Sequence, residues 1–280
     1  MESQVKDHYN SDNLTENIKT ALIKAGKNLS SLNPKEIGII DQLHIGGAPA
    51  SIKLFKKAGL KSGELVLDAG CGVGGSARLM AEQFNCKVTG IDLAQKFIEA
   101  AKFLTQCTSF ENNAEFKQGS ILKMDFDDNT FDAVLCQHVL MNIEDKTAAC
   151  KEFYRVLKPG GKLILHEVTK GNNIKLHFPV PWASKPSISF LEPWRMLSDI
   201  LDIQGFQTKL YSDESDTALF WQERAKTAVQ KTGFNTRKLG PGLVFGDNAQ
   251  FFANNMYKNL KENAIHVIES VLEKEHVEKI

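Results

Sequence analysis

Residues 66–80 read VLDAGCGVGGSARLM, and this stretch decides the fold. An apolar run ends at Asp68, glycines follow at positions 70, 72, 74 and 75, and a helical pattern begins at once. Glycines permit a tight turn and let bare backbone approach a ligand, here at a helix N-terminus, which favours polar or anionic groups. The stretch therefore predicts a strand, a ligand-contacting loop and a helix.

Outward from this loop, short apolar segments alternate with helical stretches, a pattern typical of a parallel sheet covered by helices on both faces. We expect strands at 65–68, 87–92, 115–117, 131–136, 162–167 and 206–211. Residues 264–273 fit a strand or a helix about equally, and we predict a seventh strand. Helices are expected at 75–84, 94–107, 144–157, 193–203, 217–229 and 247–260. The sequence thus predicts an α/β, doubly wound, mostly parallel sheet of seven strands.

The chain divides by pattern into four parts. Residues 1–60 read as a helical cap broken at Gly26, Pro34 and Gly46-Gly47, and residues 61–170 form the core. Residues 171–191 hold three prolines in FPVPWASKPSIS, which predicts a loop over the site. Residues 192–280 are expected to complete the same domain with a helical insertion.

Composition excludes several classes of protein. The 280 residues carry 34 basic and 34 acidic side chains, and only five of the basic ones are Arg, so nucleic acid is not an expected partner. No apolar run approaches the roughly 20 residues that span a bilayer, and the polar start lacks a secretory signal, so we expect a soluble, cytoplasmic chain. Five dispersed cysteines without a CxxC pair predict buried thiols and no metal site. We expect a monomer or a homodimer.

Asp92 makes the functional interpretation of the glycine loop more specific. It ends the segment VTGIDL, 20 positions after Gly72 (92 minus 72), where an acidic side chain can accept both hydroxyls of a ribose. The spacing of Gly70, Gly72 and Gly75 also satisfies GxGxxG, which leaves a nicotinamide-dependent oxidoreductase open. Asp68 would be poorly placed beside a pyrophosphate but well placed to attract a cationic group. The pattern therefore favours a cationic nucleoside.

Four successive motifs carry a resemblance to a known family. LVLDAGCGVGG (65–75), VTGIDL (88–93), FDAVLCQHVLMNI (131–143) and VLKPGGKLIL (156–165) resemble those of class I S-adenosylmethionine-dependent methyltransferases. DQLHIGG (41–47) and FPVPWAS (178–184) are similar to the small-molecule branch that includes sarcosine and dimethylglycine methyltransferases and actinobacterial tailoring enzymes. The resemblance covers roughly residues 40–210 and implies a Rossmann-like methyltransferase fold.

The resemblance also implies a set of cofactor-binding residues. Asp68, Gly70 and Gly72 would hold the methionine end of S-adenosylmethionine, Asp92 the ribose, and Leu93 one face of the adenine. Gln137 would meet the cofactor with its backbone, and Gln42 would close from the cap. The remaining members of the predicted cofactor set are Cys71, Ser120 and Ile121. Ser120 stands where the family usually has Asp, so it would accept one hydrogen bond without charge, unless Asp125 serves instead.

Methyl transfer from a sulfonium is an in-line displacement, so the protein must chiefly align the two reactants and exclude water. No metal is required, and the product is S-adenosylhomocysteine. A general base is needed only when the nucleophile carries a proton that must leave. His138, at the end of the fourth predicted strand, is our first choice for the base, and His44 of the cap motif is the second.

Four further residues are predicted to bind the acceptor. His166 ends the fifth predicted strand, and Phe178 and Trp182 offer aromatic rings on a stiff loop, either as an apolar wall or as faces for a cationic amine. Tyr9 would reach the methyl donor if the N-terminal segment folds over the site. For His138 and His166, a purely structural role at a strand end is the alternative.

These observations predict an enzyme, a methyltransferase that acts on a small molecule, with an amine as the leading acceptor. The alternative acceptor is an oxygen or carbon nucleophile on an aromatic or isoprenoid molecule, which would require a base such as His138 and a larger apolar pocket. A non-enzymatic alternative is a methyltransferase-like domain that binds the cofactor for regulation.

Overall fold

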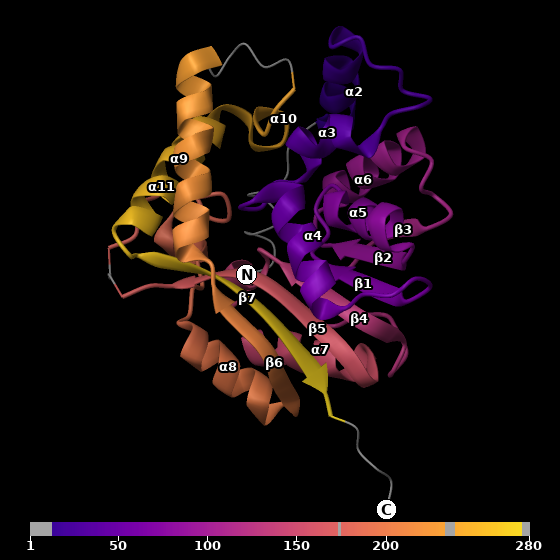
Figure 1. The fold of residues 1–280 in the computed structure, drawn as a ribbon, viewed down its shortest axis with the longest axis vertical. Coiled ribbons are helices and arrows are strands. Elements are labelled where there is room, and N and C mark those ends of the chain that lie inside the picture. Colours follow the sequence, from indigo (N-terminus) through magenta and orange to yellow (C-terminus); the bar gives the residue numbers. More distant parts are fainter. Residues whose placement is uncertain (1–12, 173–174, 233–238, 276–280) are drawn as a thin grey trace, which may run out of the picture.

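The computed structural model describes residues 13–172, 175–232 and 239–275 (Figure 1). In these ranges the strands form one seven-stranded sheet with the order β3-β2-β1-β4-β5-β7-β6. The strands are β1 (Leu65–Ala69), β2 (Lys87–Asp92), β3 (Ala114–Gln118), β4 (Phe131–Gln137), β5 (Leu157–Lys170), β6 (Phe206–Asp213) and β7 (Ile265–Lys274). Only β7 runs antiparallel to its neighbours in this sheet. The predicted doubly wound, mostly parallel fold is confirmed.

Helices connect the strands and extend beyond them. Those of the cap and the core are α2 (Leu14–Lys24), α3 (Pro34–Asp41), α4 (Gly47–Ala58), α5 (Gly75–Phe84), α6 (Gln95–Cys107) and α7 (Lys146–Val156). Those of the C-terminal part are α8 (Trp194–Ile203), α9 (Ser215–Thr232), α10 (Gly242–Phe245) and α11 (Ala249–Lys261). Short 3₁₀ turns are η1 (Leu140–Asn142), η2 (Pro186–Ile188) and η4 (Gly246–Asn248).

Apolar side chains alternate along the strands and bury both faces of the sheet. Val66, Ala133 and Leu135 pack with α4, α5 and α6 on one face. Leu67 and Val134 point to the other face and pack with α7 and α8. This two-sided burial is what strands of a parallel sheet require, and it leaves their carboxyl ends free to hold a ligand.

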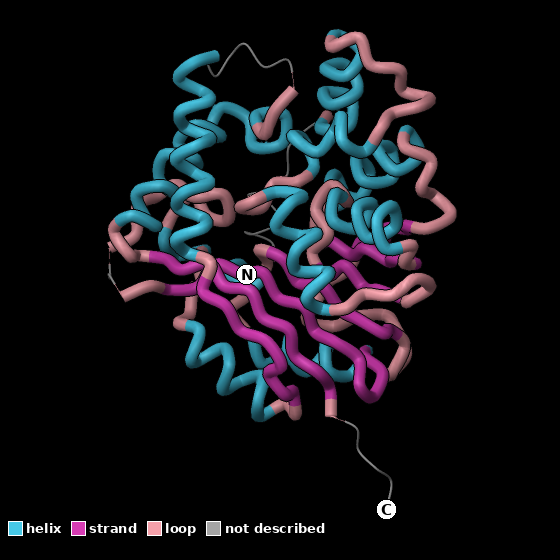
Figure 2. Tube along the Cα trace, in the orientation of Figure 1, coloured by secondary structure: helices cyan, strands magenta, loops and turns pink. Residues whose placement is uncertain are grey.

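Two groups of helices lie beyond those carboxyl ends. α2 and α3 share a buried cluster with α6 and with Val73 of the glycine loop. α9, α11 and the loop before η2 share a second cluster, which includes Trp182 and Met256. Figure 2 shows both groups on the same side of the sheet, with α9 and α11 at the left and α2 and α3 at the right.

Several predicted boundaries shift. Pro34 was expected to break a helix, but it begins α3, because proline suits the first helical turn and Asn33 and Glu36 form a capping box there. The helix predicted at 144–157 begins after Asp145, which caps it, and ends at Val156. Pro159–Gly161 were expected to terminate that helix; instead they lie inside β5, where the register with β4 shifts. Such a bulge accommodates proline within a strand.

Other predictions concern the cysteines and the membrane. All five cysteines are buried free thiols. None of the helices in the described ranges has the length and apolar character needed to cross a bilayer. The four-part division of the chain stays a prediction.

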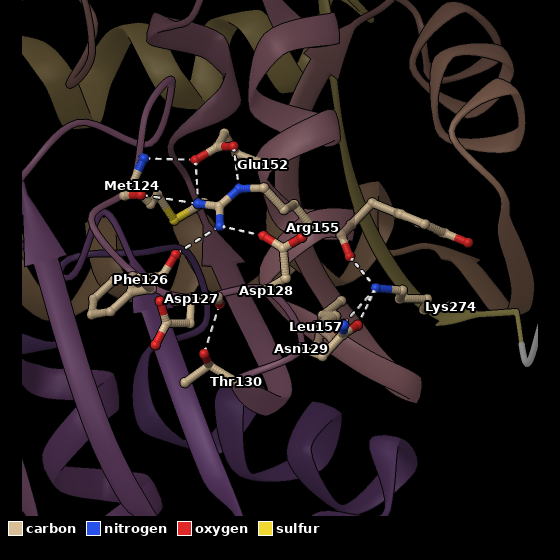
Figure 3. A network of polar contacts seen from close by, with 11 residues as sticks. Met124, Phe126, Asp127, Asp128, Asn129, Thr130, Glu152, Arg155, Leu157 and Lys274 are labelled. Atoms are coloured by element: carbon tan, nitrogen blue, oxygen red, sulfur yellow. Dashed lines mark hydrogen bonds and ion pairs between the residues drawn. The ribbon is translucent and has the colours of Figure 1, made fainter.

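Arg155 of α7 binds the segment between β3 and β4 through hydrogen bonds and ion pairs, as Figure 3 shows. Its guanidinium donates to the carbonyls of Met124 (2.9 Å) and Phe126 (2.6 Å) and pairs with Glu152 (2.7 Å) and Asp128 (2.9 Å). Lys274 at the end of β7 donates to Asn129 Oδ1 and to the carbonyls of Tyr154 and Leu157. These contacts lie where β4 begins. The site described below lies at the other end of the strands, beyond their carboxyl ends.

A buried ion pair joins the cap to the glycine loop. Arg78 of α5 donates to Asp41 Oδ2 of α3 at 2.8 Å and to the carbonyl of Val73 at 2.8 Å. The side chains of Arg78 and Asp41 are only 1% and 4% exposed. Its second nitrogen donates to Thr105 Oγ1 at 2.9 Å. One guanidinium therefore fixes three segments around the loop.

We expect Arg78→Met to lower the free energy of unfolding by about 3–5 kcal/mol, because it leaves the Asp41 carboxylate buried without a partner. Urea unfolding followed by circular dichroism measures the change. The double variant Arg78→Met/Asp41→Leu should recover part of the loss, and Lys19→Met, which removes an exposed pair with Glu16, should change little. A loss that the second substitution does not reduce would contradict the role given to the pair.

Candidate active site

A cavity of about 900 Å³ opens at the carboxyl ends of the strands, where β1 and β4 lie side by side. This is the point at which the sheet order reverses, since β2 and β3 follow on one side and β5 on the other. Ligands of open α/β sheets bind at such switch points. The glycine loop, the end of β2, the turn after β4 and the cap form one half of the wall. The loop before η2, together with α9, α10 and α11, forms the other half.

Two glycines of the loop have different reasons to be glycine. Gly70 has φ +85°, and a Cβ there would lie 2.4 Å from Val139 Cγ2, so the loop packs on the turn after β4. Gly72 has φ +53°, and a Cβ there would meet no atom within 4 Å. Because Gly72 borders the cavity, its bare backbone faces open space that a ligand can fill.

Asp92 holds the loop in place from the end of β2. Its Oδ2 accepts a hydrogen bond from the backbone of Gly72 at 2.9 Å, and its Oδ1 accepts one from the backbone of Ala94 at 2.9 Å. Burial raises the pKa of this carboxyl. Each oxygen keeps a further lone pair, so Asp92, which borders the cavity, can also accept hydrogen bonds from a ligand.

Asp68 at the end of β1 has an oxygen with no partner. Its Oδ2 is buried and makes no hydrogen bond with the described residues. Burial, and then the nearby Asp92 carboxylate, raise the pKa of Asp68 to about 7. Gln42 of the cap borders the same cavity, and its buried Oε1 also makes no hydrogen bond with the described residues.

These two acceptors fit the cofactor that the sequence motifs imply. An ammonium group offers three N–H donors and a positive charge, which match an unpaired carboxylate oxygen and an unpaired amide oxygen. Gln42 lies against the start of α5, since a Cβ on Gly75 would be 2.8 Å from its Nε2. The residues present therefore suit the amino-acid end of S-adenosylmethionine at the glycine loop.

Three histidines lie close together beside the half of the cavity that is formed by the glycine loop and the turn after β4. The ring centroids of His138 and His166 are 4.8 Å apart, those of His44 and His166 5.8 Å, and those of His44 and His138 6.1 Å. His138 follows β4 directly with φ +55°, a left-handed conformation. Its Nε2 is buried and makes no hydrogen bond with the described residues.

Gln137 links two of the histidines through its amide. Its Nε2 donates to His166 Nδ1 at 2.9 Å and to Ser51 Oγ at 3.0 Å, and its Oε1 accepts from Ser76 Oγ at 2.6 Å. Ser51 Oγ is in turn 2.8 Å from His44 Nε2. Since His166 Nδ1 accepts, the proton of its neutral ring is on Nε2.

Burial keeps these histidines neutral. It lowers the pKa of His44 to about 4 and that of His166 to about 3. Burial and then the two neighbouring histidines lower the pKa of His138 well below its usual value. At neutral pH the cluster therefore presents uncharged imidazoles.

Glu167 orients the turn that carries His138. Its carboxylate accepts hydrogen bonds from the backbone of Val139 at 3.0 Å and of Leu140 at 3.2 Å, and from Cys136 Sγ at 3.3 Å. Burial raises the pKa of this carboxyl to about 7. Glu167 is buried and does not border the cavity among the described residues, so it caps the turn.

The structure brings most of the predicted site residues to the cavity wall. Those that border it are His44, His138, Asp68, Gly70, Cys71, Gly72, Asp92, Leu93, Ser120, Ile121, Gln137, Gln42 and Trp182. Of the described residues, His166 and Phe178 do not border it: His166 lies behind Gln137, and Phe178 packs in the cluster of α9 and α11. Tyr9 lies outside the described residues. The roles of all these residues stay predictions.

Asp125, suggested as a substitute for Ser120, is not on this cavity. It lies in a shallow hollow beside Arg155. Ser120 borders the cavity, and its Oγ accepts a hydrogen bond from the backbone of Leu122 at 3.1 Å.

Sequence reasoning missed several residues of the site. Ser51 and Ser76 carry no motif of their own, and only the packing of α4 and α5 brings them to Gln137. The far wall includes Trp221, Phe252 and Met256 on α9 and α11. Their helical spacing was visible, but it does not distinguish a cavity wall from a core.

Among the described residues, no group of three or more His, Cys, Asp or Glu is arranged to hold a metal ion.

Comparison with known sequences supports the motif assignment. The family described as methyltransferase domain matches residues 67–165. Phosphoethanolamine N-methyltransferase 3 of Arabidopsis thaliana is 30% identical over 195 residues, which are 66% of this chain and 37% of that protein. A sterol 24-C-methyltransferase of Saccharomyces cerevisiae is 39% identical over 114 residues, 41% of this chain and 30% of that protein. The chain thus spans well under half the length of these relatives.

Solved structures share the fold over most of the chain. Phosphoethanolamine N-methyltransferase 2 of Haemonchus contortus, with S-adenosylhomocysteine bound, has a TM-score of 0.71 at 19% identity and covers 97% of this chain and 61% of its own. Geranyl diphosphate C-methyltransferase of Streptomyces coelicolor A3(2) scores 0.70 at 15% identity, with 98% and 97% covered. A candidate sarcosine dimethylglycine methyltransferase of Galdieria sulphuraria scores 0.65 at 16% identity, with 81% and 84% covered.

The motif order, the sheet topology and these comparisons agree. Residues 67–165 form a methyltransferase domain of the class I S-adenosylmethionine-dependent type, and the described chain has the Rossmann-like methyltransferase fold.

Proposed function

We propose that this chain transfers a methyl group from S-adenosylmethionine to a small molecule bound in the same cavity. The observation that carries the proposal is the pair of unpaired acceptors, Asp68 Oδ2 and Gln42 Oε1, in a cavity that extends past His138. The cavity's volume of about 900 Å³ lies near the upper end of the roughly 300–1,000 Å³ typical of ligand sites. It therefore leaves room for an acceptor beside the donor.

The donor side would be held by named residues. Asp68 and Gln42 accept hydrogen bonds from the ammonium group, Asp92 accepts from the ribose hydroxyls, and Gly72 gives the backbone room to approach. Bound S-adenosylmethionine supplies an electrophilic methyl carbon on a sulfonium centre. The protein contributes alignment of the two reactants and exclusion of water, which is the larger part of catalysis in such a displacement.

The acceptor side would use His138. A neutral imidazole on the cavity wall can take the proton that a phenol, an alcohol or an ammonium must lose during attack. Glu167 holds the backbone of the turn, and His166 packs edge to face against the His138 ring. Both act on the position of His138 and do not contact the acceptor.

The identity of the acceptor is open between the predicted amine and the oxygen or carbon alternative. Phosphoethanolamine N-methyltransferases favour the first, since they are relatives named for an amine. The aromatic wall formed by Trp182, Trp221 and Phe252 favours the second. A cytoplasmic location and a monomeric or dimeric state stay predictions.

We expect the affinity for S-adenosylhomocysteine to fall as pH drops below 7. The ammonium of the ligand pairs with ionised Asp68, whose pKa in the free protein is about 7. Below that value the carboxyl must lose a proton to bind, so affinity should fall about tenfold per pH unit until the lower pKa of the complex is reached. Above pH 7 the affinity should be level. Titration calorimetry between pH 5 and 8 measures this profile.

Asp68→Asn tests the same interaction without pH. It should weaken binding by about 1.5–3 kcal/mol, roughly 10- to 150-fold, and flatten the profile. Asp125→Asn, which removes a carboxylate from outside the cavity, is the matched control and should leave affinity and profile unchanged. Wild-type affinity in Asp68→Asn would count against the site.

We expect His138→Asn to reduce turnover by about 10²–10⁴-fold while leaving S-adenosylhomocysteine affinity within twofold. Asn is chosen because it tolerates the left-handed backbone that residue 138 adopts. The assay incubates the protein with a metabolite extract and isotopically labelled methyl donor and detects labelled product by mass spectrometry. His266→Asn, at the start of β7 and not on the wall of the cavity, serves as the control.

Two results would redirect this proposal. Unchanged turnover in His138→Asn would point to an acceptor without a proton to lose, such as a tertiary amine. Binding of S-adenosylhomocysteine with no labelled product from any extract would favour the non-enzymatic alternative. Because His44 and His166 have pKa values of about 4 and 3, the maximal rate should not titrate with either histidine between pH 5 and 8.

A further inference from the structure

We infer that the acceptor of this methyltransferase is an uncharged, largely apolar molecule. The inference rests on the proposed function and names the substrate class of the same site. It comes from the half of the cavity opposite the glycine loop, which we call the acceptor wall. The acceptor wall is formed by Met141, Trp182, Phe190, Trp221, Phe252 and Met256.

The acceptor wall joins four separate segments. Met141 belongs to η1, Trp182 and Phe190 to the loop around η2, Trp221 to α9, and Phe252 to α11. Aromatic and thioether side chains give large apolar contact areas at low conformational cost. Their convergence on one cavity is the arrangement that binds an apolar ligand.

Charge is distributed away from the acceptor wall. Of the described residues that border the cavity, five are Asp, Glu, Lys or Arg: Lys35, Asp68, Asp92, Glu144 and Asp145. Asp68 and Asp92 serve the donor half. Lys35, Glu144 and Asp145 are exposed to solvent, and Asp145 caps α7. A cation placed against the acceptor wall would thus have no buried carboxylate there, among these residues, to offset its loss of water.

The histidines at the border of the two halves add no charge. Burial lowers the pKa of His44 to about 4, so the ring is neutral at pH 7. A neutral ring suits hydrogen bonding to an uncharged hydroxyl and offers no anion to a cationic amine.

The acceptor wall is held in place by polar contacts within and between its segments. Trp182 Nε1 donates to Ser189 Oγ at 2.9 Å, and its carbonyl accepts from Asn142 Nδ2 at 2.7 Å. Asn259 of α11 bonds both the N–H and the carbonyl of His177, at 2.8 and 3.0 Å. Asn255 donates to the carbonyl of Pro179 at 2.9 Å. With these groups satisfied, the Trp182 ring offers mainly carbon atoms to a ligand.

Aromatic rings can also hold a quaternary ammonium through their faces. That outcome would preserve the predicted cationic amine, so the test compares two ligands that differ in one terminal group, an uncharged hydroxyl or a charged ammonium. The pair 4-phenyl-1-butanol and 4-phenylbutylamine shares one carbon skeleton, and the amine is a cation at pH 7.

The experiment measures displacement of the uncharged fluorescent probe N-phenyl-1-naphthylamine from protein saturated with S-adenosylhomocysteine. We expect the alcohol to displace the probe at a concentration at least tenfold lower than the amine. Equal or stronger displacement by the amine overturns the inference, as does failure of the probe to bind. Calorimetry with S-adenosylhomocysteine on the same sample separates the two proposals, because absent heat would contradict the proposed function itself.

Gln222 provides matched variants. It is buried on α9, borders the cavity and has no part in the donor site. Gln222→Glu would place a carboxylate beside the acceptor wall and should reduce the preference for the alcohol at least threefold, whereas Gln222→Leu should maintain or increase it. An increased preference for the alcohol in Gln222→Glu, or equal behaviour of the two variants, would overturn the placement of the acceptor.

Discussion

A carboxylate oxygen buried without a hydrogen-bond partner carries a free-energy cost, and the site depends on the fold keeping Asp68 Oδ2 in that state. Asp68 is the penultimate residue of β1, the glycine loop follows that strand directly, and Asp92 fixes that loop through the backbone of Gly72. Burial, and then the nearby Asp92 carboxylate, raise the pKa of Asp68 to about 7. A cationic ligand that pairs with Asp68 would reduce this free-energy cost. The same buried carboxylate that is unfavourable in the free site would therefore favour binding of a cation.

Among the described residues, Asp41 Oδ1 and Arg78 Nε are also buried without a hydrogen-bond partner, but neither residue borders the cavity, which makes Asp68 informative. Glu167 accepts from two backbone N–H groups, and Arg78 pairs with Asp41. Lys146 donates to the carbonyls of Ile143 and Phe190. Each of these ions joins segments that are distant in sequence and so has a structural role. An ionisable oxygen without a partner on a cavity wall has no such structural purpose and fits a ligand contact.

The parts of the fold that sequence predicts well are those with strong local signals. The strand, glycine loop and helix at 65–84 have an apolar run, four glycines and a helical pattern in succession. The nearly continuous burial of β7 gives no such signal, because its apolar residues suit a strand or a helix about equally. The prediction that Pro34 breaks a helix was wrong, because proline can begin a helix as well as end one. Here Asn33 caps the helix, and Pro34 begins it. Gly75 is explained only by tertiary contact, since a Cβ there would lie 2.2 Å from the carbonyl of Asp41.

The acceptor wall illustrates the limit of such reasoning in physical terms. The donor site is built mostly from residues 68–138, on strands whose order the topology fixes, so its motifs are local and readable. The opposing wall takes Trp182, Trp221 and Phe252 from a loop and two helices that meet only in the folded chain. A tryptophan on a helix looks the same in sequence whether it faces a core or a cavity. Substrate class therefore follows from charge and shape around the cavity, whereas the donor follows from the motif.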